Sequence, residues 1–171
     1  MLMLARPTFE EVFENELDFV CRSLTRFGVS SADLSDVAQE VFLTVSDLLE
    51  DYDPERPIRP WLFAIAYRFA LRYRSRWAKR TEVLMDVPDT VSPEPFGEEK
   101  LDMDRAREIA LRALETIEPN RRAMFVMCEL EGAKVGDIAT ALAIPLNTAY
   151  SRLRLAREEF RRAVSSLGGR P

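Results

Sequence analysis

Hydrophobic side chains recur every three to four residues along most of the chain, which is the spacing of amphipathic α-helices. Thr8 and Glu11 form a capping-box pattern that predicts a first helix from about residue 8, and Gly28 ends it. Its apolar positions are Phe9, Val12, Phe13, Leu17, Val20 and Leu24. A second helix is expected from a cap at Ser30 or Ser31 to about Leu49. Its apolar stripe is Leu34, Val37, Ala38, Val41, Phe42, Val45 and Leu48.

A proline-rich segment follows the second helix. Three prolines between Tyr52 and Pro60 predict a loop over these residues, because proline disrupts a helix interior. A third helix is expected from about Trp61 to about Lys79. Its core face is Leu62, Ile65, Ala66, Phe69 and Tyr73.

Residues 81–104 have little periodicity and many acidic side chains, with Pro88, Pro93, Pro95 and Gly97 among them. This composition is typical of a flexible linker. Helical patterns resume at about 103–117, 120–131, 135–142 and 146–165, and no strand-like alternation occurs. The sequence therefore predicts an all-α protein of two small helical domains, 1–80 and 105–171, joined by an acidic linker over 81–104.

The last two helices predict a helix-turn-helix, since a short helix and a tight turn precede a longer helix with a basic outer face. In that longer helix, Ala149, Leu153, Ala156 and Phe160 form the core stripe. Asn147 is expected to cap the helix, and Thr148 lies where free N–H groups can bind phosphate. The candidate duplex-DNA residues are Asn147, Thr148, Tyr150, Ser151, Arg152, Arg154 and Arg157. On this spacing alone, an ordinary amphipathic helix with solvated arginines fits equally well.

The third helix carries a second basic surface. Arg68, Arg72, Arg76 and Lys79 share one face, and like charges so placed repel one another unless a polyanion binds. Five aromatic residues interleave with them: Trp61, Phe63, Tyr67, Tyr73 and Trp77. Cations beside aromatic rings suit single-stranded nucleic acid. The alternative places some of these rings in the core, and we assign Trp61 to it.

Charge is distributed in blocks along the 171 residues, although the net charge of -5 by itself argues against a nucleic-acid partner. Two segments are acidic: residues 1–53 carry 12 acidic and 3 basic side chains, and residues 81–104 carry 8 acidic and 1 basic. Two segments are basic: residues 54–80 carry 8 basic and 1 acidic side chains, and residues 132–171 carry 7 basic and 3 acidic. This pattern indicates two basic surfaces separated by an acidic spacer, with an acidic first segment that can face a protein.

The composition excludes several function classes. The chain has no histidine, and its two cysteines lie far apart in apolar helical patterns, so no zinc site or acid–base pair is expected. It also lacks a glycine-rich phosphate loop, and we expect no enzymatic activity and no cofactor. No apolar stretch approaches the roughly 18–20 residues of a membrane helix. We therefore expect a cytoplasmic protein with reduced cysteines and no membrane insertion.

Several motifs, in order, resemble bacterial sigma factors of the extracytoplasmic-function (ECF) type. The segment 33–42, Asp-Leu-Ser-Asp-Val-Ala-Gln-Glu-Val-Phe, looks like the helix that docks on core RNA polymerase, and 60–66, Pro-Trp-Leu-Phe-Ala-Ile-Ala, resembles the segment that follows it. Glu131-Gly132, Asp137-Ile138-Ala139 and the run 148–157 look like region four. The chain departs from the family in having Tyr67-Arg68 where Asn is usual.

The resemblance implies roles for particular residues. Asp36, Gln39, Glu40 and Leu43 would meet the clamp helices of the largest polymerase subunits. The loop 52–60 and the third helix would hold the minus-ten promoter element as single strand, through Arg59, Tyr67, Arg68, Arg72, Arg76 and Lys79. The last helix would read the minus-thirty-five element as duplex, and the acidic linker would enter the polymerase's nucleic-acid channel.

The resemblance thus predicts a promoter-specificity subunit that promotes strand opening without catalysis of its own. Two other functions stay open on the residues alone. One is a free-standing helix-turn-helix regulator, which would leave the first 80 residues without a role. The other is a helical adaptor that binds only protein, which would leave the arginines without a role. The sequence leaves open whether an anti-sigma factor binds the chain.

Overall fold

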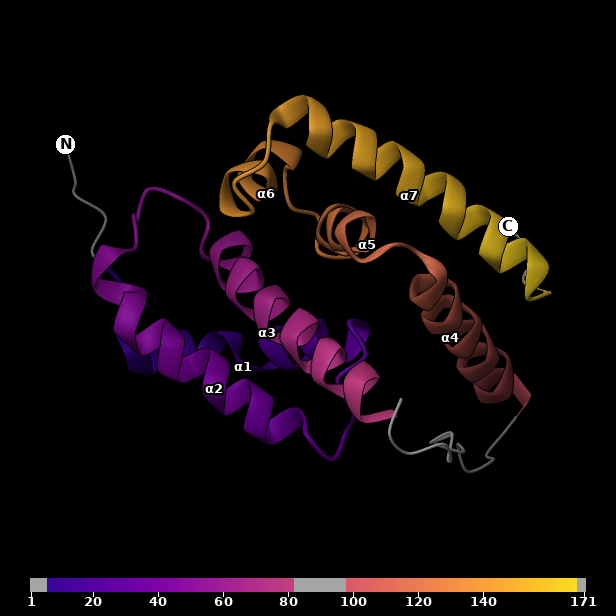
Figure 1. Ribbon diagram of the computed structural model, residues 1–171, viewed down its shortest axis with the longest axis horizontal. Helices are drawn as coiled ribbons and strands as arrows, with labels where there is room; N and C mark the ends of the chain where they lie inside the picture. Colours follow the sequence, from indigo (N-terminus) through magenta and orange to yellow (C-terminus); the bar gives the residue numbers. More distant parts are fainter. Residues whose placement is uncertain (1–5, 82–97, 169–171) are drawn as a thin grey trace.

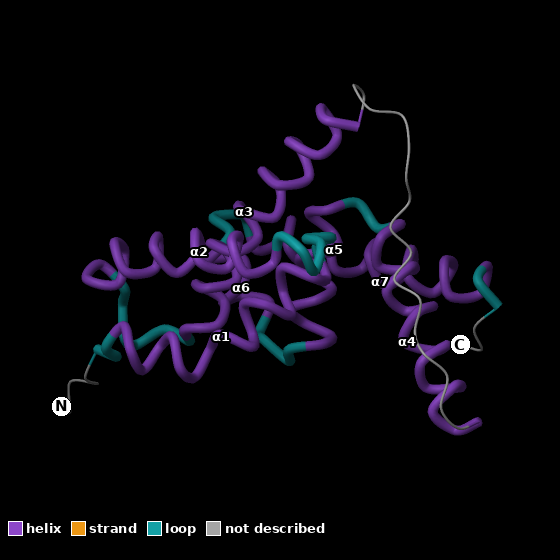
Figure 2. The backbone as a smooth tube through the Cα atoms, turned by 90° about the horizontal axis from the view of Figure 1, so that it is seen from below, coloured by secondary structure: helices purple, strands orange, loops and turns teal. Residues whose placement is uncertain are grey.

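The computed structural model describes residues 6–81 and 98–168, with side chains for 6–77 and 105–168. Within these ranges every regular element is a helix, as predicted (Figure 2). The first group comprises α1 (Phe9–Arg26), α2 (Leu34–Leu48), the short 3-10 turn Leu49–Asp51 and α3 (Ile58–Thr81). The second comprises α4 (Glu98–Thr116), α5 (Pro119–Phe125), the π-helical turn Val126–Leu130, α6 (Val135–Ala141) and α7 (Leu146–Ser166). The two groups lie side by side (Figure 1).

The first three helices pack against one another around a common core. The capping box at the start of α1 is confirmed: the Glu11 N–H donates to Thr8 Oγ1 at 3.2 Å, and the Thr8 N–H donates to Glu11 Oε2 at 2.8 Å. Gly28 follows the helix with φ +85°, a left-handed conformation that favours glycine. The predicted apolar stripe of α2 is buried at Val37, Ala38, Val41, Phe42 and Val45, whereas Leu48 at its end is 39% exposed.

The predicted cap of the second helix is wrong. Asp33 occupies the N-cap, and Ser30 lies in the preceding turn, where its hydroxyl donates to Asp33 Oδ2 at 2.8 Å. The Tyr73 hydroxyl of α3 donates to the same oxygen at 2.7 Å. This tertiary contact between α3 and the start of α2 is invisible in the local sequence pattern.

The predicted loop 52–60 is too long, because α3 begins at Ile58 rather than near Trp61. Pro60 is the third residue of the helix, a position whose N–H would have no helical partner, so the ring breaks no hydrogen bond there. Pro60 and Tyr52 are buried. Arg59 therefore belongs to the first turn of α3 and not to a loop.

The second group of helices starts earlier than predicted. Helix α4 begins at Glu98 instead of about 103, directly after Gly97, so the last residues of the predicted linker are helical. Acidic residues in a first turn favour the start of a helix. The rest of the predicted linker, 82–97, lies outside the described residues.

The predicted helix 120–131 divides into α5 and a π-helical turn. The Glu131 N–H donates to the Val126 carbonyl at 3.1 Å, five residues earlier, and Gly132 with φ +66° ends the element. The short helix α6 and the long helix α7 occur where predicted, and Ala149, Leu153 and Ala156 are buried. Asn147 does not cap α7, because the N-cap is Pro145 and Asn147 is the second helical residue.

Buried residues of the two groups form one continuous hydrophobic cluster. Helix α3 contacts α6 directly, and the Tyr67 hydroxyl of α3 donates to Asn120 Oδ1 of α5 at 3.2 Å. Arg122 of α5 is 1% exposed, and its guanidinium carbon lies 5.9 Å from the centre of the Phe27 ring. The two predicted domains therefore share a packed interface, which the sequence did not predict.

Both cysteines, Cys21 and Cys128, are free and half-buried, which agrees with the prediction that they form no disulfide. In the described part of the chain, no group of histidine, cysteine or acidic side chains could hold a metal ion. Across the same residues, none of the helices has the length and apolarity needed to cross a membrane.

Candidate nucleic-acid interface

The basic stripe of α3 is an exposed surface. Arg68, Arg72 and Arg76 are all exposed, and none of them forms an ion pair with another described residue. The Arg72 guanidinium carbon lies 4.1 Å from the centre of the Phe69 ring. The side chain of Lys79, the fourth predicted member, lies outside the described residues. Three unpaired cations on one helix face can bind the phosphates of a nucleic-acid strand.

The aromatic residues that interleave with this stripe are mostly not available to bases. Phe63 and Tyr67 are 0% and 6% exposed, and their rings stack in parallel with centroids 6.0 Å apart. Trp61 is half-buried and packs against the core and against Tyr52, with ring centroids 4.9 Å apart, so it belongs to the edge of the core to which we assign it. Only Trp77 of the five is largely exposed, at 47%. The helix therefore offers a cationic surface with one outer ring.

Arg59 lies apart from the basic stripe, at the start of α3. Its Nε donates to Glu16 Oε2 of α1 at 2.8 Å, and its guanidinium carbon lies 5.3 Å from the centre of the Phe19 ring. Its side chain is 48% exposed. The loop before it lines a cleft of about 320 Å³ together with Trp61 and residues of α6.

The outer face of α7 carries the predicted duplex-DNA residues. Asn147, Tyr150, Ser151, Arg154 and Arg157 are exposed, and Thr148 and Arg152 are half-buried. Two of the arginines have partners: Arg154 Nη1 lies 2.8 Å from Glu158 Oε1, and Arg157 Nη2 lies 2.6 Å from Glu129 Oε1. Tyr150, in the first turns of the helix, is 56% exposed. This face presents polar and aromatic side chains at the end of a helix that can enter a major groove.

The outer face of α2 carries two acidic side chains, a glutamine and a leucine. Asp36, Gln39 and Glu40 are exposed, and Leu43 is 61% exposed, the largest value among the exposed large hydrophobic residues. An apolar groove beside this face is lined by Phe13, Phe42 and Leu43 among others, and runs between α1 and α2. An exposed leucine in an acidic rim is typical of a protein-binding surface.

Tyr67, a predicted single-strand residue, lies in the interface between the two groups of helices. Burial raises the pKa of Tyr67 to about 12, and the charge of Glu118 acts in the same direction, while Arg152, Arg122 and Arg74 oppose it. In this arrangement the Tyr67 ring cannot contact DNA. Its neighbours are Phe27 at the end of α1, with the ring centres 5.1 Å apart, and residues of α3, α5 and α7.

We expect this burial to make the free energy of unfolding depend on alkaline pH. An unfolded tyrosine loses its proton near pH 10, whereas folded Tyr67 keeps it until about pH 12. The stabilisation that comes from keeping Tyr67 protonated in the folded state is therefore fully present below pH 10 and is lost as the pH rises to about 12. Urea unfolding measured between about pH 10 and 12 should show that the free energy of unfolding falls more steeply with pH for the wild type than for Tyr67→Phe. Equal slopes would contradict the burial of the phenol.

The residues that join the two groups of helices carry no signal in the sequence pattern. Arg122 is preceded by Arg121, and two adjacent arginines on a short helix resemble an ordinary solvated surface. Arg26 and Glu131 form an ion pair although 105 residues separate them in the sequence. Only a record of paired substitutions across related sequences could have revealed such a contact.

Family models match both groups of helices. Residues 12–81 match sigma-70 region 2, and residues 107–160 match sigma-70 region 4. The first match covers α2 and α3, and the second covers the helix-turn-helix.

Relatives and solved structures agree with these matches. The ECF RNA polymerase sigma factor SigE of Mycolicibacterium smegmatis is 30% identical over 159 residues, 92% of this chain and 62% of the relative, so the chain spans less than two thirds of that protein. The ECF RNA polymerase sigma-E factor of Escherichia coli K12 is 28% identical over 156 residues, covering 85% of this chain and 81% of the relative.

Two solved structures share the fold. The structure of CnrH in complex with the cytosolic domain of CnrY superposes with a TM-score of 0.66 at 22% identity, covering 92% of this chain and 88% of that one. The sigma factor RpoE of Bartonella quintana, in complex with the anti-sigma factor NepR, superposes with a TM-score of 0.70 at 16% identity, covering 92% of this chain and 96% of that one. With both region matches in order along one chain and ECF sigma factors among its relatives, this protein belongs to the ECF group of the sigma-70 family.

Proposed function

We propose that this chain is a promoter-specificity subunit that binds core RNA polymerase, recognises minus-thirty-five and minus-ten elements and promotes strand opening. The observation that carries this proposal is the exposed face of α3, where Arg68, Arg72 and Arg76 have no ion-pair partner among the described residues. Such a surface lowers its electrostatic repulsion when it binds a polyanion. The sigma-70 region 2 match over the same helix supports a promoter strand as that polyanion.

The proposal assigns three surfaces. The acidic face of α2, with Asp36, Gln39, Glu40 and Leu43, docks on the polymerase clamp helices. The face of α3 binds the opened minus-ten strand, and α7 reads the minus-thirty-five duplex through Tyr150, Ser151 and Arg154, with Arg152 and Arg157 beside them. The two groups of helices, α1–α3 and α4–α7, act as the two binding domains, and the chain between α3 and α4 links them.

No catalytic step is needed for this function. Unpaired bases trapped on the protein drive strand opening, since each base held by the subunit is withdrawn from the duplex. We propose that the protein acts in the cytoplasm, where the polymerase is. An anti-sigma factor is a further proposed partner, supported by the two similar structures, in which CnrH is in complex with CnrY and RpoE with NepR.

The test is transcription in vitro with bacterial core RNA polymerase on a library of random promoter sequences. We expect transcripts that need this chain and that share two sequence elements upstream of their starts. A library that gives no chain-dependent transcript would overturn the proposal. A free-standing regulator would instead bind duplex sites without the polymerase.

The salt dependence of holoenzyme binding to a selected promoter tests the basic face of α3. On a single strand, each lost phosphate contact makes the negative slope of log affinity against log salt shallower by about 0.7. We expect this decrease for Arg68→Ala and for Arg72→Ala. Arg107→Ala, an exposed arginine of α4 outside the proposed surfaces, is the control and should leave the slope unchanged. Equal slopes for all variants would show that the α3 arginines do not touch phosphate.

A further inference from the structure

The first two turns of α7 expose two large apolar side chains. Leu146, the first residue of the helix, is 49% exposed, and Tyr150 is 56% exposed. Four residues separate them, so they lie on the same face of the helix, about one turn apart. The hydroxyl of Tyr150 has no hydrogen-bond partner in the part of the chain that the structure describes. Covering this apolar area with a partner would therefore be favourable.

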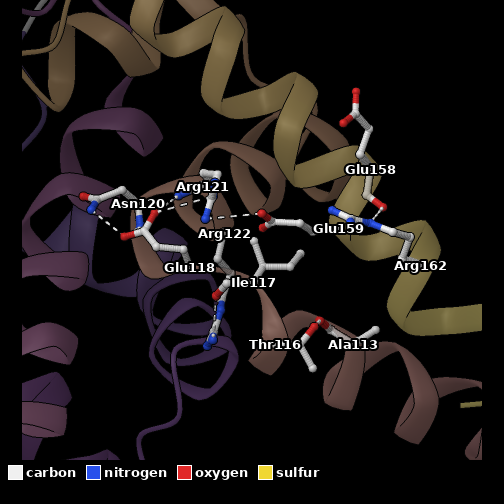
Figure 3. A network of polar contacts seen from close by, with 10 residues as sticks. All are labelled: Ala113, Thr116, Ile117, Glu118, Asn120, Arg121, Arg122, Glu158, Glu159 and Arg162. Atoms are coloured by element: carbon white, nitrogen blue, oxygen red, sulfur yellow. Dashed lines mark hydrogen bonds and ion pairs between the residues drawn. The ribbon is translucent and has the colours of Figure 1, made fainter. Parts of the chain in front are cut away.

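The rest of the second group of helices fixes the position of this pair. Helices α4, α5 and α6 all pack on α7, and Ala149 of α7 is fully buried. Further along the helix, Arg121 of α5 pairs with Glu159 of α7, with 3.2 Å between Nη2 and Oε1 (Figure 3). Because these contacts hold α7 from its buried side, Leu146 and Tyr150 keep a defined place on the outer surface of the helix-turn-helix.

The arginines further along the outer face of α7 are engaged with carboxylates. Arg154 Nη1 lies 2.8 Å from Glu158 Oε1. Arg157 donates to Glu129 Oε1 from both Nε, at 3.0 Å, and Nη2, at 2.6 Å. An arginine reads guanine with two donors of one guanidinium. Arg157 has such an edge occupied and Arg154 has one terminal nitrogen occupied, whereas about half of each apolar side chain is exposed.

The major groove of DNA contains one kind of apolar group. Thymine presents its C5-methyl group there, and apolar side chains contact it, whereas the bases are otherwise read through hydrogen-bond donors and acceptors. The N-terminal residues of the second helix of a helix-turn-helix are the ones that reach base edges. Leu146 and Tyr150 lie in these turns and are about 6 Å apart along the helix axis. Since base pairs repeat about every 3.4 Å, the two side chains can contact methyl groups one or two base pairs apart.

We propose that Leu146 and Tyr150 read the C5-methyl groups of two thymines in the minus-thirty-five duplex. This inference rests on the proposed function, because that function places the start of α7 in the major groove, and it names the bases that the helix selects. The exposed side chains of Asn147 and Ser151 lie next to the pair in the sequence and supply hydrogen-bonding groups for the same base pairs. Contact with a methyl group removes apolar area from water on both partners, which favours thymine over a base without this group.

Replacement of thymine by deoxyuracil tests this proposal, because it removes the methyl group and keeps every hydrogen-bonding group of the base. The probe is a duplex selected from a random-sequence library for binding to the holoenzyme, with the thymines of its minus-thirty-five element replaced one at a time. Competition against the unmodified duplex gives the ratio of the two affinities at each position. We expect the wild-type holoenzyme to lose affinity about fourfold at two positions, the factor for burial of one methyl group, and to tolerate replacement of the other thymines.

Each of the two side chains should account for one position. Leu146→Ala should abolish the preference for thymine over deoxyuracil at one of the two positions, and Tyr150→Ala should abolish it at the other. Tyr150→Phe should keep the preference, because the ring and not the hydroxyl covers the methyl group. Lys134→Ala is the control: Lys134 is an exposed cation at the N-cap of α6, and its removal should change the affinity for both duplexes by the same factor.

Equal affinity of the wild-type holoenzyme for the thymine and deoxyuracil duplexes at every position would overturn the proposal. A selected element without thymine would do the same, and so would a thymine preference that survives both alanine variants. Both alanine variants should bind core polymerase like the wild type in the absence of DNA. A loss of that affinity without a change in the thymine preference would assign the pair to a protein interface instead.

The proposed function is tested separately by chain-dependent transcription. Transcripts from promoters that show no thymine preference would remove only the present inference. A holoenzyme that selects no duplex and gives no transcript would remove the proposed function, and the reading of thymine with it.

Discussion

Arg122→Ala is expected to lower the free energy of unfolding by about 3–5 kcal/mol, the cost of truncating a large buried side chain and leaving acceptors unpaired. The Arg122 Nη2 group donates to the Glu115 carbonyl at 2.6 Å and to the Ile117 carbonyl at 3.1 Å. These carbonyls lie at the end of α4, where helical partners are lacking. Urea unfolding followed by circular dichroism measures the loss.

Arg121→Ala is the matched control on the same helix. Arg121 is 30% exposed and pairs with Glu159 at 3.2 Å, so its removal should cost no more than about 1 kcal/mol. Arg122→Lys should fall between the two, because an ammonium keeps the charge but not the planar fork. Equal losses for Arg121→Ala and Arg122→Ala would show that the buried guanidinium does not support α4 and α5.

Leu43→Arg is expected to weaken binding to core RNA polymerase by about 30-fold, the size of a hot-spot loss of about 2 kcal/mol. Leu43 is 61% exposed on α2 and supplies apolar area on the face that carries Asp36 and Glu40. An added positive charge there opposes the basic partner that this face fits. Competition against a fluorescently labelled wild-type chain for core polymerase measures the change.

Leu48→Arg is the control for this substitution. Leu48 is on the same helix, 39% exposed, and lies outside the proposed docking face. It should leave polymerase binding near the wild-type value. Both variants should retain the helical content of the wild type, because both leucines are partly exposed. A Leu43→Arg variant that binds the polymerase normally would place the docking surface elsewhere.

The helices and their buried faces could be predicted from the sequence because both depend on local spacing. The stripe Ala149, Leu153 and Ala156 in α7 needed only helical periodicity, and the exposure of Leu43 followed from its place off the α2 stripe. The boundaries were less predictable where proline was involved. Counting the prolines between 52 and 60 predicts a loop as far as Pro60, but proline is compatible with a first helical turn, and the helix begins earlier, at Ile58.

The contacts between the two groups could not be predicted, because no local pattern relates distant residues. Tyr67 belongs to an apolar helix face, and its periodicity is the same whether the ring binds DNA or packs on another domain. In the folded chain its hydroxyl donates to Asn120, 53 residues away. Similarly, nothing in the sequence around Arg122 distinguishes it from a surface arginine. Its burial is explained by the two backbone carbonyls that accept hydrogen bonds from its guanidinium.

The continuous core has a consequence for the cooperativity of folding. While the two groups share buried residues, a loss of packing around Phe27 is transmitted to Arg122 and so to the ends of α4 and α5. The two groups then behave as one cooperative unit. Separation of the groups divides it into two smaller units, each with less buried apolar surface. Any separation of the two groups would therefore cost part of the global stability, and a partner that binds only the separated form would have to supply that difference.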